Sequence, residues 1–365
     1  MPVSSANGGE RGLVVADLIR RYSDEVAVGP ISFAVAEGEF FSLLGPSGCG
    51  KTTTLRCIAG FETVDAGGIW LEGRRLDGVP AHKRGIGLVF QTPALFPHLT
   101  VAQNVAFGLR THRVDKGTAA ARVAAMLELI GLPQYGNRMP SQLSGGQQQR
   151  IALARSLVLE PHLLLLDEPL SSLDLKLRVQ MREELRGLQR RLRKTTIFVT
   201  HDQTEALALS DRIAVLSQGR IEQIGTPAEI YQAPVSRFVA DFIGNSNLIE
   251  AEVVGFAEGL VDLATASGLH LYAARAEAPA RKNVTLLIRP ERIRIGVAEA
   301  GCGNNLRASI TDRMYLGEDA QYRILVEQSQ PLLLIRKSGD EELSSAGAST
   351  LHVGIEPSDI IVLER

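Results

Sequence analysis

The stretch Gly45-Pro46-Ser47-Gly48-Cys49-Gly50-Lys51-Thr52 fits the pattern G-x-x-x-x-G-K-[ST] at every position, and Thr53 follows it. An apolar run of strand length precedes the stretch at 39–44, and a short helix is expected over 52–59, closed by Gly60. Glycines let the backbone bend so that N–H groups and the helix N-terminus surround an anion. The stretch therefore predicts a triphosphate site in which Lys51 reaches the β- and γ-phosphates and the Thr52 hydroxyl ligates Mg²⁺. A glycine-rich turn that carries a lysine by chance is the alternative.

Length and composition narrow the class of protein. A chain of 365 residues can hold two or more domains, and 45% hydrophobic with 22% charged residues is typical of a soluble globular protein. The net charge of −2 argues against a general nucleic-acid binder. Three cysteines, Cys49, Cys57 and Cys302, predict a reducing compartment without a disulfide framework. Residues 1–11 show no signal peptide, and no 18-residue apolar run occurs, so we expect membrane association only through a partner.

Two early segments carry candidate site residues. The alternating runs at 13–19 and 31–35 predict an antiparallel β-rich start. Tyr22 lies between these runs and could stack on a purine base, although a surface or core tyrosine is the alternative. The apolar strand at 85–90 delivers Gln91 to its carboxyl end, where ligands collect in open parallel sheets. A solvated loop glutamine is the other interpretation.

Residues 92–160 change in character and predict a helical insertion between two strands. Val123, Met126, Leu127 and Ile130 recur at the spacing of an amphipathic helix. The insertion ends in Leu143-Ser144-Gly145-Gly146-Gln147, followed by a helical pattern over 148–159. Ser-Gly-Gly at a helix start offers a second set of free N–H groups for an anion. A turn that only caps the helix is the alternative.

The four leucines at 163–166 predict a buried central parallel strand that ends in Asp167 and Glu168. Burying acidic side chains at such a position costs free energy unless they bind a cation or accept a proton. We expect Asp167 to hold Mg²⁺ through its hydration shell, and Glu168 to orient and deprotonate the attacking water of an in-line phosphoryl transfer. Two acids in a surface loop is the alternative, and it fits the leucine run poorly.

Two further polar residues flank the next strand. Asp174 precedes a long helix predicted at 175–194. The basic residues at the end of this helix are explained by their favourable interaction with the helix dipole, rather than by a nucleic-acid site. The β-branched strand at 195–200 presents His201, which could contact a γ-phosphate oxygen or serve a structural role.

From 247 onward the chain consists of short strands, which predicts one β-barrel-like domain, or two small intertwined ones, of the OB type. The expected strands are 248–254, 283–288, 307–310, 321–326, 332–335 and 360–363. Few aromatic residues occur there, which argues against the base stacking that many OB domains use.

Taken in order and spacing, these motifs resemble the ATPase subunits of ABC transporters over the first two thirds of the chain. The resemblance implies an α/β fold: a P-loop ABC ATPase domain over 12–244 with an inserted helical subdomain at about 92–160, then a C-terminal OB-like regulatory β-barrel over 245–365. It implies ATP and Mg²⁺ as cofactors. The implied catalytic residues are Lys51, Gln91, Glu168 and His201, and the implied Mg²⁺ residues are Thr52, Gln91 and Asp167. The implied nucleotide-binding residues are Tyr22, Gly45, Pro46, Ser47, Gly48, Cys49, Gly50, Lys51, Thr52, Thr53, Gln91, Ser144, Gly145, Gly146, Gln147, Asp174 and His201.

The resemblance also implies partners. In this family two copies form a head-to-tail homodimer in which Ser144 to Gln147 of one copy cap ATP on the loop of the other. Two transmembrane permease subunits and, indirectly, an extracytoplasmic solute-binding protein complete the importer, with no nucleic acid. The chain is thus expected on the cytoplasmic face of the cell membrane as a peripheral ATPase.

The C-terminal third is similar to the regulatory domain of importer ATPases for polyamines, iron and sugars. The strings that carry this are Phe242-Ile243-Gly244-Asn245 and Leu287-Ile288-Arg289-Pro290-Glu291. Residues 54–62 and Tyr315-Leu316-Gly317-Glu318 look closest to polyamine-type members, with iron(III), sugar, phosphonate or another small solute as alternatives. The loop that follows Gln91 carries Thr92-Pro93, where related loops usually carry Asn or Ser followed by Tyr. This difference lies at the expected partner-docking surface.

Two other classes of function fit the sequence less well. Soluble ABC ATPases of DNA repair or translation normally carry two ATPase units or long coiled-coil or zinc insertions, which this sequence does not show. A nucleotide sensor without turnover would not need Glu168 beside Asp167.

Overall fold

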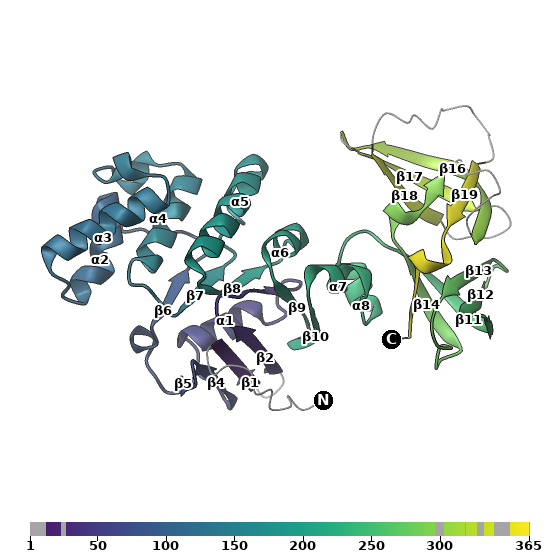
Figure 1. Cartoon of the computed structure of the whole chain (residues 1–365), viewed down its shortest axis with the longest axis horizontal. Coiled ribbons are helices and arrows are strands. Elements are labelled where there is room, and N and C mark those ends of the chain that lie inside the picture. Colours follow the sequence, from purple (N-terminus) through teal and green to yellow (C-terminus); the bar gives the residue numbers. More distant parts are fainter. Residues whose placement is uncertain are drawn as a thin grey trace. The chain divides into compact units, whose positions relative to one another are not determined.

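The computed structural model describes residues 12–22, 27–295, 303–317, 319–326, 332–338 and 351–364. Cys302, Glu318 and residues 1–11 lie outside these ranges, together with the predictions made for them. The chain divides into two compact units, Met1–Ile230 and Tyr231–Arg365, and each is described by itself (Figure 1).

The first unit is built on a six-stranded sheet in the order β10-β9-β3-β8-β7-β6. The five strands from β9 to β6 are parallel, and β10 pairs antiparallel with β9. Every residue of β3, β7 and β8 is buried, as expected for parallel strands covered on both faces. The strands are β3 (Phe40–Leu44), β6 (Ile86–Val89), β7 (Leu163–Asp167), β8 (Thr195–Thr200), β9 (Arg212–Ser217) and β10 (Arg220–Gly225).

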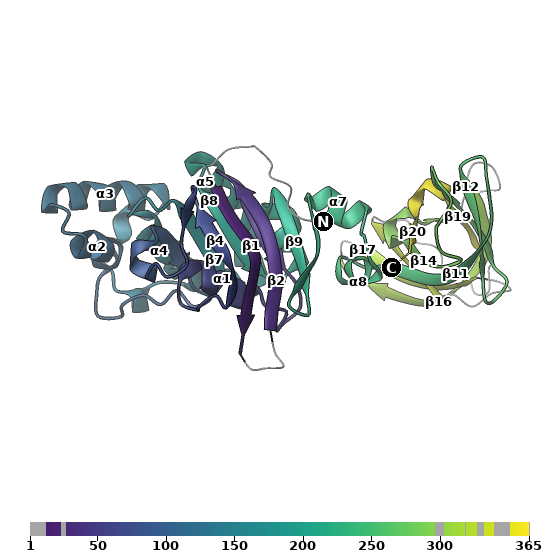
Figure 2. The same ribbon diagram turned by 90° about the horizontal axis from the view of Figure 1, so that it is seen from below.

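A smaller antiparallel sheet, β2-β1-β4-β5, confirms the predicted β-rich start. Its strands are β1 (Gly12–Arg21), β2 (Ala27–Ala36), β4 (Ala66–Leu71) and β5 (Arg74–Arg75). One hydrophobic core joins this sheet, the central sheet and helix α1 (Lys51–Ala59), as the stacked rings of Phe33 and Phe41 illustrate at 5.1 Å. This core holds α1 against the central sheet, beside β7 (Figure 2).

The chain between β6 and β7 forms helices α2 (Val101–Thr111), α3 (Lys116–Leu129) and α4 (Gly145–Leu157). They share a core of their own and gather at one end of the unit (Figures 1 and 2). Helices α5 (Leu175–Leu192), α6 (Gln203–Leu209) and α7 (Pro227–Gln232) follow. The long predicted helix ends two residues early because Arg193 adopts a left-handed conformation with φ 49°.

The second unit contains α8 (Arg237–Phe242) and two five-stranded antiparallel sheets around one core. The first sheet is β13 (His270–Ala274), β12 (Leu260–Thr265), β11 (Asn247–Ala257), β14 (Asn283–Ile288) and β20 (Ile360–Leu363). The second is β15 (Arg294–Ile295), β19 (Leu351–Ile355), β16 (Asn304–Tyr315), β17 (Asp319–Val326) and β18 (Leu332–Ser338). All six predicted strands are present, and β12, β13, β15 and β19 are additional.

Arg289 ties the segment before β11 to this second unit. Its side chain is 4% exposed and donates to the carbonyls of Ile243 at 2.6 Å and Tyr231 at 2.9 Å and to Ser246 Oγ at 2.6 Å. The guanidinium also lies 4.1 Å from the ring centroid of Tyr231. Arg289 thus holds residues 231–246 within the second compact unit, Tyr231–Arg365. A C-terminal domain that begins at 245 stays a prediction.

We expect Arg289→Gln to lower the free energy of unfolding of the second unit by about 3 kcal/mol, because several buried carbonyls lose a charged donor. Hydrogen exchange measured by mass spectrometry should rise in residues 231–246. Arg292→Gln, at an exposed neighbour paired with Asp359 at 3.6 Å, is the control and should change little. Equal exchange in the two variants would contradict the anchoring role.

Candidate functional site

The pairing of the parallel strands brings several predicted site residues to one edge of the sheet. Leu44 pairs with Thr200, Asp167 with Val199, and Val89 with Leu166, so β3, β8, β7 and β6 end together. The residues that follow these ends include Gly45, His201, Glu168 and Gln91. This is the edge at which open α/β sheets bind ligands.

The glycine-rich loop has the conformation that the motif predicts. Gly48 and Gly50 have φ of 80° and 101°, in the left-handed region that favours glycine, and α1 begins at Lys51. A Cβ on Gly45 would lie 2.4 Å from the carbonyl oxygen of Leu216, so a side chain has no room there. Ser47 and Gly48 lie at the exposed tip of the loop, while Pro46 is half-buried and Cys49 is buried.

Lys51 is the charge at the centre of this loop. The residue is 5% exposed, and its ammonium donates to the carbonyl oxygens of Gly45 at 2.7 Å and Pro46 at 2.9 Å. A buried cation beside the free N–H groups of a helix start makes an environment suited to an anion. The loop can therefore cradle a phosphate chain.

Thr52 and Asp167 face one another across the start of α1 and the end of β7. The Thr52 hydroxyl donates to Asp167 Oδ1 at 3.2 Å, and Asp167 is 9% exposed. Burial raises the pKa of the Asp167 carboxyl, while the Thr52 hydrogen bond opposes that shift. A cation at this point would offset the cost of the buried carboxylate, so this pair fits Mg²⁺. Among the described residues, no group of three or more His, Cys, Asp or Glu side chains is placed to hold a metal.

Glu168 and His201 meet at the same edge. His201 Nδ1 lies 3.1 Å from Glu168 Oε2, and the Glu168 backbone N–H donates to the carbonyl of Val199 at 3.0 Å. Glu168 has φ 45°, an uncommon value for a residue with a side chain. Ser171 Oγ donates to the Glu168 carbonyl at 2.9 Å and helps to hold this turn. The turn keeps the carboxylate beside His201.

Tyr22 lies beside the first turn of α1. Its hydroxyl is 3.0 Å from Thr53 Oγ1, and the side chain is 54% exposed. The Arg20 guanidinium lies 5.3 Å from the Tyr22 ring centroid and pairs with Glu62 and Asp65. Arg20 is a further residue of this site that no motif marks, although the sequence places it and Arg21 directly before Tyr22.

Ser144, Gly145, Gly146, Gln147 and Asp174 form a second group. Ser144 caps α4 in a capping box with Gln147, and Asp174 caps α5 by accepting from the Leu177 N–H at 3.0 Å. A Cβ on Gly146 would touch the Leu177 side chain at 3.0 Å, so the starts of α4 and α5 pack closely. No hydrogen bond or ion pair within the described ranges joins this second group to residues 45–53.

Gln91 is exposed at the end of β6, beside Phe90, which contacts Phe61 at a centroid distance of 6.3 Å. The loop that follows is held by two residues that the sequence analysis missed. Asn104, fully buried, donates to the carbonyls of Phe96 and Leu99, and Arg155 donates to the carbonyls of Ala94 and Pro93. No motif marks these two residues, because their role depends on tertiary contacts. In the described part of the chain, no helix has the length and apolar character needed to cross a membrane.

Comparisons with known proteins agree with this geometry. The ABC transporter family model matches residues 28–171, and the TOBE domain model matches residues 286–363. The sulfate/thiosulfate import ATP-binding protein CysA 2 of Chromobacterium violaceum is 50% identical over 91% of this chain and 89% of the relative. The spermidine/putrescine import ATP-binding protein PotA of Rubrobacter xylanophilus is 46% identical over 95% of this chain and 92% of the relative. The PotA protein of Thermobifida fusca is 45% identical over 92% of this chain and 88% of the relative.

Among solved structures, cbiO1 from Clostridium perfringens, part of the ABC transporter complex cbiONQ, aligns with a TM-score of 0.56 and 31% identity. The alignment covers 60% of this chain and 89% of that chain. The predicted α/β ABC ATPase fold with an OB-like C-terminal domain is thereby confirmed. The chain belongs to the import ATP-binding subunits of ABC transporters, and it is an ATPase.

Proposed function

We propose that this ATPase binds ATP and Mg²⁺ at the shared carboxyl edge of β3, β8, β7 and β6, works as a homodimer, and drives import of a small organic polycation. The proposal is supported above all by the convergence of Lys51, Asp167, Glu168 and His201 at that edge. The roles of these residues follow from their convergence.

The glycine-rich loop at 45–52 and its neighbours would bind the nucleotide. The ammonium of Lys51 and the N–H groups at the start of α1 complement the charge of the phosphates. The exposed ring of Tyr22, steadied by its contact with Thr53, offers a face on which adenine can stack. Thr52 and Asp167 would hold Mg²⁺, which supplies charge neutralisation for the phosphates. Gln91, at the end of the neighbouring strand, would join them when the loop after β6 approaches the nucleotide.

The proton of the attacking water goes to Glu168. A carboxylate at the strand end can orient a water and accept its proton, which is the task of a general base. His201 Nδ1 lies 3.1 Å from that carboxylate and positions it by donating to it. In the doubly protonated ring, Nε2 would also donate to a phosphate oxygen. The backbone turn at Glu168 keeps both groups at the same edge.

The second group would complete the site on a partner copy. Ser144 to Gln147 offer free N–H groups at the start of α4, which suit the same kind of anion as the loop does. They pack with the Asp174 region. A two-fold arrangement that sets this group against the other copy's loop is closed and self-complementary.

Two aromatic pairs support docking of a permease subunit near the loop after β6. Phe61 is 57% exposed and pairs with Phe90, and Phe107 is 41% exposed and lies 4.4 Å from the ring of Phe96. Exposed aromatic side chains of this kind favour a protein partner. Two permease subunits, with a solute-binding protein on the far side, would place the chain on the cytoplasmic face of the cell membrane.

The solute is proposed from the relatives. The names of the relatives in R. xylanophilus and T. fusca, spermidine/putrescine importers, support a polyamine. The name of the C. violaceum relative gives a second candidate, a small oxyanion such as sulfate.

Glu168→Gln should keep ATP binding and lose about 10² to 10⁴-fold in the rate of ATP turnover, because the amide cannot accept the water's proton. Phosphate release and nucleotide binding by equilibrium dialysis measure the two effects. The exposed Glu183→Gln variant on α5 is the matched control and should retain the native rate. Turnover near the native rate in Glu168→Gln would remove Glu168 from this role.

A mixed dimer tests the composite site. Joining a Lys51→Ala chain to a Ser144→Arg chain places both lesions at one site and leaves the other intact, so phosphate release and nucleotide occlusion should survive. Either homodimer has every site damaged and should be nearly inactive in both measurements. Complete loss in mixed and pure dimers alike would count against independent sites, and activity from a verified monomer would exclude the dimer model.

The solute can be identified by copurifying the chain with its permease and solute-binding protein and reconstituting the complex in vesicles. Spermidine or putrescine should raise the ATPase rate and accumulate inside, while sulfate should do neither. Stimulation and uptake with sulfate alone would overturn the polyamine assignment and leave the ATPase assignment unaffected.

A further inference from the structure

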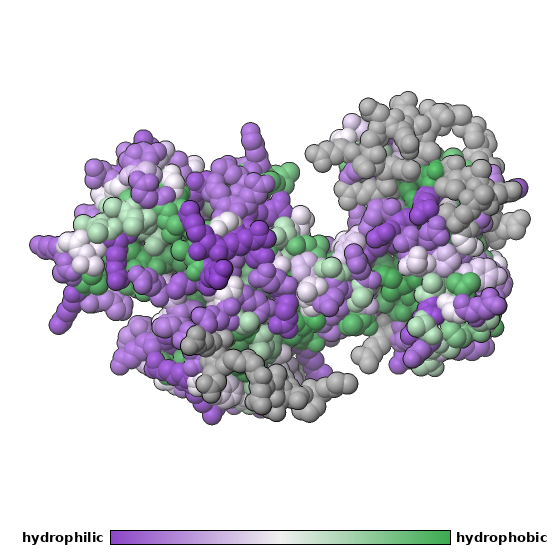
Figure 3. Space-filling view, viewed as in Figure 1, coloured by the Kyte–Doolittle hydropathy of each residue, from purple (hydrophilic) through white to green (hydrophobic). Residues whose placement is uncertain are grey.

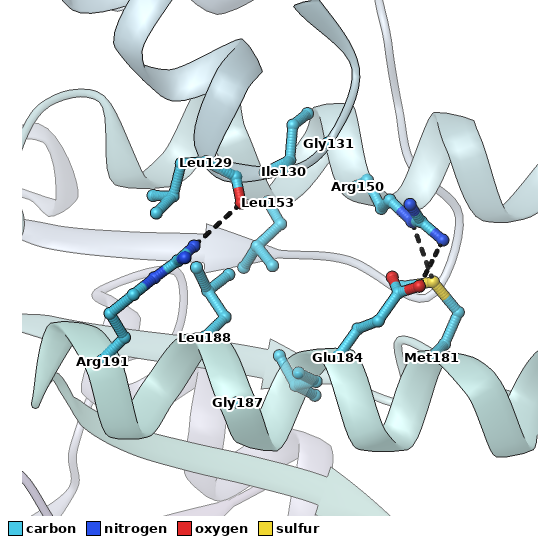
Figure 4. A pocket seen from close by; sticks show the side chains of 11 residues that line it. Leu129, Ile130, Gly131, Arg150, Leu153, Met181, Glu184, Gly187, Leu188 and Arg191 are labelled. Atoms are coloured by element: carbon cyan, nitrogen blue, oxygen red, sulfur yellow. Dashed lines mark hydrogen bonds and ion pairs between the residues drawn. The ribbon is translucent and has the colours of Figure 1, made fainter.

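A pocket of about 420 Å³ lies where the helical segment meets α5, and its walls come from three helices (Figure 4). None of its lining residues belongs to either group of predicted site residues. Its volume lies within the range of small-molecule sites. The space-filling view shows hydrophobic surface over the helical segment bordering hydrophilic surface (Figure 3). The lining residues used below are Leu129, Arg150, Leu153, Glu184, Gly187 and Arg191.

Gly187 keeps part of this pocket open. It lies inside the 18-residue helix α5, where glycine is less stable than alanine. A Cβ built on Gly187 meets no atom within 4 Å, so neighbouring atoms do not require a glycine there. Gly187 is exposed and lines the pocket, so a larger side chain at this position would take up part of the open space beside it.

The two ends of the pocket differ in charge. At one end Arg150 pairs with Glu184 at 2.6 Å, so that pair is neutral as a whole. At the other end Arg191 donates to the Leu129 carbonyl at 3.0 Å (Figure 4). No ion pair among the described residues includes Arg191. The pocket therefore combines apolar walls with an exposed arginine, Arg191, at its rim that forms no ion pair among the described residues.

We propose that this pocket is a binding site for a small amphipathic carboxylate, with the carboxylate at Arg191 and the apolar chain against Leu129 and Leu153. Arg has donors to spare for a carboxylate beside its contact with Leu129. The ligand touches α4 and α5 at once, and Gly146 at the start of α4 packs on Leu177 of α5. Occupancy therefore alters the fit between these helices and with it the rate of ATP turnover. The regulatory part rests on the proposed function, whereas binding does not.

The probe is decanoate, titrated calorimetrically into the full chain below the concentration at which it forms micelles. Saturable binding to one site is expected, at least tenfold tighter than binding of decan-1-ol or decylamine, which keep the chain but change the charged end. Absence of saturable binding, or equal affinity for the three probes, would overturn the site.

Paired variants locate the ligand. Gly187→Phe fills the pocket and Arg191→Gln removes its cation, so each should weaken decanoate binding at least tenfold. Gly187→Ala and Arg190→Gln, the neighbouring arginine that does not line this pocket, are the matched controls and should bind as the native chain does. Circular dichroism and ATP binding verify that each variant is folded. Equal weakening in variants and controls would contradict the assigned position.

The regulatory role is tested separately by phosphate release. Decanoate should change the ATPase rate of the native chain and leave that of Gly187→Phe unchanged. A bound decanoate that leaves native turnover unchanged would overturn the regulatory role. Turnover without decanoate reports independently on the proposed ATP site.

Discussion

The parallel pairing of β3, β8, β7 and β6 is the constraint on which the site depends. Parallel strands run in the same direction, so their carboxyl ends meet at a common edge. Their side chains alternate between the two faces of the sheet, so both faces need a cover. Strand β7 shows how this is met: Leu163 and Leu165 pack in the core shared with α1, while Leu164 and Leu166 pack in the core shared with α4 and α5. The leucine run therefore serves two cores at once. Asp167 and Glu168 leave the strand at the point where that double burial ends.

Burying charged groups at this edge costs folding free energy, and the protein offsets that cost only in part. Lys51 and Asp167 are both largely buried, and their hydrogen bonds go to neutral groups: carbonyl oxygens for Lys51 and a hydroxyl for Asp167. The charges of Arg56 and Lys51 favour the Asp167 carboxylate, but the burial of that carboxylate still raises its pKa. Neutral dipoles offset the desolvation of an ion less completely than an opposite charge does. A polyanion bound with a divalent cation brings both opposite charges together. In the proposed site, the same arrangement that costs folding free energy would therefore favour the binding of a metal–triphosphate complex.

Local sequence was enough to predict the elements that carry the motifs. The strand at 195–200 matches β8, and α1 starts one residue before its predicted position. Features that depend on distant contacts were not predictable, such as the left-handed backbone of Glu168 and the support of the loop after β6 by Asn104 and Arg155. The pocket beside Gly187 needs three helices to be placed before it exists. Among the missed strands, β15 has only two residues, but β12 and β13 do alternate, with buried Val261, Leu263, Leu271 and Ala273, so that signal was present in the sequence.

The contact between α4 and α5 joins the two groups of site residues. Glu168 leads through a short segment, held by its hydrogen bond with Ser171, to Asp174 and α5, on which the start of α4 rests. This contact is less tightly packed than a core. Gln149 is 4% exposed, its amide nitrogen and oxygen have no hydrogen-bond partner among the described residues, and a cavity of about 20 Å³ adjoins it. Unsatisfied buried amides are costly, and a void removes packing contacts, so the present arrangement of the two helices gains less free energy than a fully packed one. A rearrangement of α4 against α5 would therefore lose less free energy than one within a fully packed core.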